Sequence, residues 1–120
     1  MHVAKRHHLE IEQIGRVTVA TFTDAEIVED RTVEAIRQEL YRLADRVGPG
    51  DLLLDFRNVA RAISRLWGLL PRLREAVQGA GGRVALCAID PGLVEIVKIL
   101  SFDRLFRIYR TEQEALNALQ

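Results

Sequence analysis

Residues 51–90 have the sequence DLLLDFRNVARAISRLWGLLPRLREAVQGAGGRVALCAID. The short apolar run at residues 52–54 is typical of a strand buried on both faces. The mostly apolar run at residues 83–89 predicts a second strand, after glycines that end the intervening segment. That segment predicts a helix, although Pro71 leaves its first residue open, because apolar residues recur at helical spacing at Leu66, Leu69, Leu70, Leu73, Ala76 and Val77.

The flanking sequence extends this strand, helix, strand unit on both sides. Residues 9–14 and 17–22 predict a hairpin that turns at Gly15-Arg16, and the stripe from Val33 to Val47 predicts a helix ended by Gly48-Pro49-Gly50. Pro91 opens another helix to about residue 100. Residues 105–109 predict a last strand, and Thr111 with Glu114 forms a capping box for a last helix. The order ββαβαβαβα predicts an α/β domain with a mixed β-sheet and interleaved helices.

Composition narrows the class of protein. A chain of 120 residues with 48% hydrophobic and 28% charged residues suits one globular domain. We expect residues 1–8 to be a flexible segment, with His2, His7 and His8 exposed, and residues 9–119 to be the domain. The formal net charge of zero gives no global attraction to nucleic acid or anionic membranes.

Cysteine usage and hydropathy predict the compartment. The single cysteine, Cys87, has no partner for an internal disulfide, and no Cys/His spacing is typical of zinc. We expect Cys87 to be a buried, inert small hydrophobe. Neither a secretory signal nor a membrane-spanning run is present. A cytoplasmic protein with no metal or cofactor is the expectation.

Residues 52–116 carry a family resemblance. After the strand ending Leu54-Asp55-Phe56 come a serine-led helix, Gly81-Gly82-Arg83-Val84-Ala85-Leu86, the helix at Pro91, and Leu105-Phe106-Arg107-Ile108-Tyr109 followed by Thr111-Glu112-Gln113-Glu114-Ala115-Leu116. This pattern resembles the STAS domain of bacterial anti-sigma factor antagonists. The likeness extends over roughly residues 9 to 119. It implies a STAS-like fold and a non-enzymatic regulatory domain that binds an anti-sigma factor with serine kinase activity.

The resemblance also implies a phosphoacceptor. The family's helix opens with Asp-Ser-Ser-Gly-Leu-Gly, which falls on residues 63–68, so Ser64 occupies the phosphorylated position and Gly68 the closing glycine. Ile63 and Arg65 replace the acidic residue and the second serine. From the residues alone, Ser64 is either a simple helix N-cap or a site where a phosphate would meet free backbone N–H groups.

Arginines surround this serine. Five occur from residue 57 to residue 74 without an intervening acidic residue, namely Arg57, Arg61, Arg65, Arg72 and Arg74. They either receive an acidic partner or a phosphate, or form a solvated face. Because the formal net charge of the chain is zero, they do not predict a nucleic-acid site. Helical geometry predicts a half-exposed Trp67, either an interface anchor or a residue flanking the core. We interpret Asp55 as a turn or capping residue.

Three functions remain open at this stage. The first is an anti-sigma factor antagonist in transcription regulation, switched at Ser64, with a partner surface made by Arg61, Arg65, Trp67, Gly68 and Arg72. The second is a STAS scaffold subunit that is never phosphorylated and that self-associates as a homo-oligomer. The third is a sensor that holds a small anion with Arg57, Arg61 and Arg65. The sequence contains no phosphate loop, nucleophile elbow or catalytic carboxylate pair.

Overall fold

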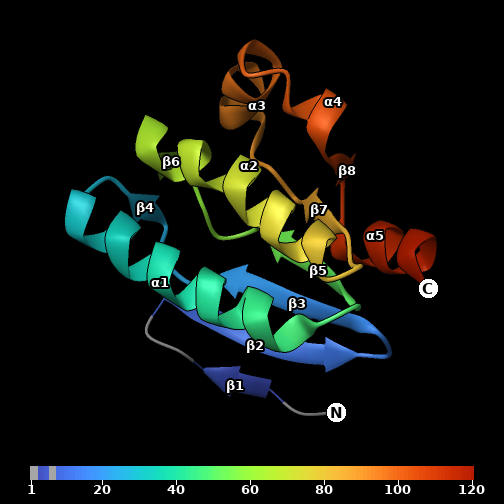
Figure 1. Ribbon diagram of the computed structural model, residues 1–120. Coiled ribbons are helices and arrows are strands. Elements are labelled where there is room, and N and C mark those ends of the chain that lie inside the picture. Colours follow the sequence, from blue (N-terminus) through green and yellow to red (C-terminus); the bar gives the residue numbers. More distant parts are fainter. Residues whose placement is uncertain (1–2, 6–7) are drawn as a thin grey trace.

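The central feature of the fold is one mixed β-sheet. The computed structural model describes residues 3–5, by backbone alone, and 8–120. Within these residues, six strands form a sheet in the order β1-β2-β3-β5-β7-β8 (Figure 1). The first two pairings are antiparallel and the other three are parallel. The strands are β1 (Val3–Lys5), β2 (Leu9–Ile14), β3 (Val17–Phe22), β5 (Asp51–Asp55), β7 (Val84–Cys87) and β8 (Arg107–Tyr109).

Helices cover both faces of the sheet. On one face, α1 (Asp30–Val47) and α2 (Ser64–Gly79) lie side by side, and α3 (Pro91–Ile99) and α4 (Phe102–Leu105) lie beyond α2 (Figure 1). Their apolar side chains form the main core with the facing residues of the sheet. On the other face, α5 (Glu112–Leu119) packs its residues Ala115, Leu116 and Leu119 over the centre of the sheet. The prediction of an α/β domain with a mixed sheet and interleaved helices is confirmed.

Local signals placed most elements correctly. Both strands of the predicted hairpin are present, and Gly15 in its turn has a φ of 60°, which glycine adopts without strain. Thr111 caps α5 by accepting from the Glu114 N–H at 3.1 Å, as predicted. Glu114, however, reaches back to the Arg110 N–H at 3.3 Å. In the predicted capping box, the Glu114 side chain would accept from the Thr111 N–H, whereas it accepts from the N–H one residue earlier.

Several short elements differ from the prediction. Strands β4 (Glu26–Ile27) and β6 (Arg61–Ala62) pair in parallel as a separate two-stranded sheet beside the start of α2. The predicted strand at residues 105–109 begins only at Arg107, because Phe102–Leu105 form the helical turn α4. Phe106 then lies in the core. Two-residue strands and one-turn helices are too short to leave a periodic pattern in the sequence.

Three residues of the N-terminal segment pair with the sheet. Val3–Lys5 pair antiparallel with β2, so Val3 lies opposite Glu12. His8 is half-buried, and its Nδ1 lies 2.6 Å from Oδ2 of Asp24. Residues 1, 2, 6 and 7, which include His2 and His7, lie outside the described residues. An unpaired edge of β2 is the physical reason that a third strand adds there.

Candidate protein-binding site at the start of α2

The first turn of α2 carries the predicted phosphoacceptor. Ile63 is the N-cap, in an extended conformation with φ −79° and ψ 162°, and it provides no side-chain cap. Ser64 is the first helical residue and is exposed. The prediction of Ser64 as the N-cap is wrong by one position. Its hydroxyl still lies at the helix terminus, where the first backbone N–H groups have no intrahelical acceptors and the helix dipole favours an anion.

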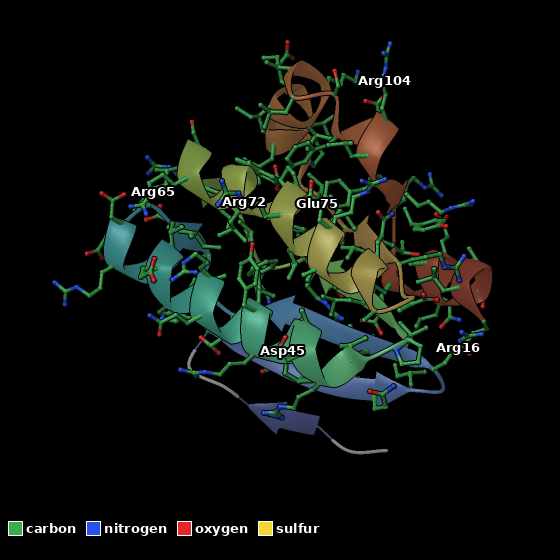
Figure 2. All side chains as sticks on the ribbon, viewed as in Figure 1. Arg16, Asp45, Arg65, Arg72, Glu75 and Arg104 are labelled. Carbon is green, nitrogen blue, oxygen red and sulfur yellow. The ribbon has the colours of Figure 1, made fainter. Side chains whose placement is uncertain are left out.

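An exposed stripe runs along α2 from this serine. Residues four apart lie on one side of a helix, so Ser64, Gly68 and Arg72 follow one another, and all three are exposed. We call these three residues the docking stripe. A Cβ added at Gly68 would meet nothing within 4 Å, so another backbone can approach the helix closely there. Arg72, labelled in Figure 2, forms no ion pair within the described part of the chain.

The arginines that flank the stripe are neutralised by carboxylates distant in sequence. Nη1 of Arg61 lies 3.3 Å from Oε2 of Glu26, which joins β6 to β4. Nη1 of Arg65 lies 3.0 Å from Oδ1 of Asp30, which joins the first turns of α2 and α1. The excess of positive charge that the sequence shows around Ser64 is therefore reduced on the surface by acidic residues of other elements. These exposed pairs stabilise the fold weakly and can exchange partners.

Arg57 belongs to a third such network, beside the buried end of β5. Its Nη2 lies 2.6 Å from Oδ2 of Asp55 and also contacts the Glu112 carboxylate of α5. Asp55 is fully buried, and its Oδ1 accepts from the Arg57 N–H at 3.0 Å, so the prediction of a turn residue is confirmed. Burial raises the pKa of Glu112, as does its hydrogen bond with Asp55, whereas Arg57 opposes this shift. The structure therefore does not leave Arg57, Arg61 and Arg65 free to hold an anion together.

The expectation that Trp67 is half exposed is wrong. Its side chain is 0% exposed and stacks on Phe56, with ring centroids 5.4 Å apart and an interplanar angle of 11°. Phe102 of α4 packs edge-on from the other side, at 6.3 Å between centroids. Helical periodicity could not foresee this because the covering residue comes from a short element far along the chain. Trp67 therefore supports the docking stripe from beneath and does not itself form part of the exposed surface.

An apolar surface that the sequence analysis missed lies at the end of α3. Ile99 is 70% exposed and Leu100 is 40% exposed. Phe102, two residues after Leu100, packs against Trp67 and so ties the end of α3 to α2. Large exposed aliphatic side chains on adjacent positions are typical of surfaces that contact another protein. A signal was available, since residues 93–100 contain six large apolar side chains, more than one buried face of a short helix requires.

The described residues, 3–5 and 8–120, contain neither a metal site nor an accessible reactive thiol. No group of three or more His, Cys, Asp and Glu side chains there could hold a metal ion. Cys87 is fully buried, as predicted, and burial raises the pKa of its thiol. No helix in the described part of the chain has the length and hydropathy needed to cross a membrane.

Comparisons with known proteins identify the same fold. The STAS domain family model matches residues 8–115. An anti-sigma factor antagonist (STAS) domain protein from Planctomyces limnophilus is 26% identical, with a TM-score of 0.84, covering 92% of this chain and 97% of its own. An anti-sigma factor antagonist from Mycobacterium paratuberculosis is 22% identical, with a TM-score of 0.81 and 92% coverage of both chains. The phosphorylated form of the Bacillus cell fate determinant SpoIIAA is 18% identical, with a TM-score of 0.72, covering 93% and 99%.

Proposed function

This chain belongs to the STAS domain family, and we propose that it is a non-enzymatic, cytoplasmic regulator of the anti-sigma factor antagonist type. In this proposal it binds an anti-sigma factor with serine kinase activity, and phosphorylation of Ser64 ends the complex. While the chain is bound to the anti-sigma factor, the sigma factor is released and transcription can begin. The observation that carries the proposal is the exposed Ser64 at the head of the docking stripe.

The docking stripe and the end of α3 together supply the chemistry of a protein interface. Gly68 offers open helix backbone, Arg72 offers a guanidinium with no ion pair to any described residue, and Ile99 and Leu100 offer apolar surface. Protein interfaces usually have a centre of apolar side chains and arginines with a rim of polar residues. Arg61 and Arg65 border this area and form exposed ion pairs with Glu26 and Asp30.

A phosphate on Ser64 would act through charge. It adds about −1.5 to −2 charge and a hydrated bulk to the head of the stripe. The helix terminus and the Arg65 guanidinium, which could leave Asp30, would tolerate that charge within the domain. A partner surface that fits the neutral serine would instead have to desolvate the phosphate. The modification therefore weakens docking while leaving the fold intact.

The test uses a purified anti-sigma kinase encoded in the same genome. We expect the wild-type chain to gain one phosphate with ATP, by intact mass, and Ser64→Ala to gain none. Binding measured by biolayer interferometry should persist in Ser64→Ala and fall sharply in Ser64→Glu. Gly68→Arg should also abolish binding. Gly79→Arg is its matched control, because Gly79 lies at the other end of α2 and also has open space around its Cβ position.

One observation favours a second candidate, a STAS scaffold subunit without a phosphorylation switch. Ile63 packs against the core at the N-cap position, where the family has an acidic residue, so a kinase would meet an apolar neighbour of Ser64. In that case Ser64→Glu should bind the partner as tightly as the wild type does, and the wild-type chain should gain no phosphate from the kinase. Self-association of the scaffold would show as a dimer or larger species in light scattering, and a strict monomer at high concentration would exclude it.

A further inference from the structure

A cavity lies at the end of α2 opposite Ser64. Its volume is about 290 Å³, and it is bordered by the second half of α2, the beginnings of β7 and β8, and α4. Ser64 and Gln78, which lines the cavity, are fourteen residues apart on one helix, and this corresponds to about 21 Å at 1.5 Å per residue. The cavity is therefore separate from the docking stripe.

Arginine dominates the cavity wall. Arg74 comes from α2, Arg83 precedes β7, Arg104 comes from α4 and Arg107 begins β8. Three separate parts of the chain, at residues 74, 83 and 104–107, thus bring the same residue type to one place, whereas Asp103 is the one acidic residue in the lining. Among the described residues, Arg74, Arg104 and Arg107 form no ion pair. This distinguishes them from Arg61 and Arg65 near Ser64, which are paired with Glu26 and Asp30.

Arg83 provides a fixed point in this wall. Its Nε and Nη2 lie 3.2 and 2.8 Å from the carboxylate of Asp51, which is 2% exposed. Asp51 also accepts from the Arg83 backbone N–H at 3.1 Å. The guanidinium has five N–H donors and this pair engages only some of them. The remaining donors are held in one orientation, so they can bind an anion without losing rotamer freedom.

The remaining lining groups restrict the kind of anion. Gln78 adds an amide that donates or accepts, and Leu105, which is 37% exposed, adds an apolar contact. Figure 2 shows Arg104 extending outward from α4, so it lies at the rim, and Arg74, Arg83 and Arg107 complete the arginine lining. Several guanidinium groups around one space suit a phosphate dianion, which accepts forked hydrogen bonds. The volume approaches the lower end of small-molecule sites, which is about 300 Å³.

We infer that this cavity binds a small organic phosphate, a molecule with a phosphate monoester and a compact apolar portion. Arg74, Arg83 and Arg107 hold the phosphate, and Leu105 contacts the apolar portion. This proposed site goes beyond the proposed docking function, and each of the two proposals can be wrong without affecting the other. Docking at Ser64 does not require it, and the binding measurement below needs no protein partner.

The experiment is a ¹⁵N–¹H NMR titration of the whole chain with phenyl phosphate. We expect saturable shifts of the amides of Gln78, Arg83, Leu105 and Arg107, weaker binding of inorganic phosphate, and no shifts with phenol. Arg107→Gln and Arg74→Gln should each weaken phenyl phosphate binding by about tenfold, the effect of losing one charge-assisted contact. Arg72→Gln is the matched control, because Arg72 is an exposed arginine of α2 that does not line the cavity.

Several results would overturn the inference. The first is the absence of shifts at about 10 mM phenyl phosphate, where even a millimolar site is mostly occupied. The second is equal weakening by Arg72→Gln, which would show diffuse charge attraction instead of a site. Equal affinity for inorganic phosphate would show that the cavity does not recognise the organic part of the ligand. Tighter binding of a phosphoserine peptide would show that the ligand is a phosphorylated protein and not a small molecule. Spectra of each free variant establish that it is folded.

Discussion

The indole of Trp67 lies nearly parallel to the ring of Phe56, with 11° between the planes and 5.4 Å between the centroids. This stack joins the start of α2 to the end of β5, and Phe102 closes it from α4. The indole N–H has no hydrogen-bond partner in the described part of the chain, so the contribution of Trp67 to stability comes from packing. The aromatic cluster therefore packs beneath the part of α2 that presents the docking stripe.

Removal of this cluster's central ring should destabilise the fold. We expect Trp67→Ala to lower the free energy of unfolding by about 3–5 kcal/mol, the usual cost of a large aromatic cavity. Trp67→Phe should cost less and should retain partner binding, because the side chain does not reach the surface. Urea unfolding followed by circular dichroism measures both. In the wild type, Trp67 is the one tryptophan, so a red-shifted native fluorescence would contradict its burial.

Two glycines should respond in opposite directions to alanine. At Gly68 an added Cβ meets nothing within 4 Å, so Gly68→Ala should stabilise the fold by up to about 1 kcal/mol through helix propensity. At Gly82 it would lie 2.1 Å from the Gly50 carbonyl oxygen. Gly82→Ala should therefore destabilise by about 3 kcal/mol, the upper end of overpacking costs. Thermal unfolding of the two variants gives the comparison, and equal melting temperatures would refute the close approach.

Cys87 should be unreactive in the native protein. The thiol is fully buried in β7, and burial raises its pKa, so little thiolate forms and no reagent reaches it. We expect alkylation by iodoacetamide at neutral pH to be negligible in buffer and rapid in urea, with mass spectrometry as the readout. Rapid modification of the folded chain would show that β7 opens locally. Cys87→Ala supplies the unreactive control.

The strands and long helices were predictable because their signals are local. The period-two alternation and the turn at Gly15-Arg16 gave the hairpin, and the Thr111 hydroxyl gave the start of α5. What escaped prediction depends on pairs distant in sequence. Glu26 and Asp30 neutralise the arginines beside Ser64, a relation that no window of the sequence contains. A one-turn helix likewise buried Trp67, and three separate parts of the chain formed the arginine cavity.

The stability of the fold should depend on pH through Glu112. Burial raises the pKa of this carboxyl in the folded state above its ordinary value of 4.5. The folded state therefore binds the proton more tightly than the unfolded chain does. This contribution to stability is present in full below pH 4.5 and is lost as the pH rises through the folded-state pKa. Glu112→Gln has no titrating group at this position, so its stability should lack this dependence on pH.

Urea unfolding at a series of pH values tests this sign. The wild-type chain should lose stability relative to Glu112→Gln as the pH rises from 4.5 towards neutrality. Glu95→Gln is the control, because Glu95 is exposed on α3 and forms no ion pair within the described residues, so its difference from wild type should not change with pH. A wild-type chain that gains stability relative to Glu112→Gln over this range would show that the Arg57 ion pair outweighs burial at Glu112.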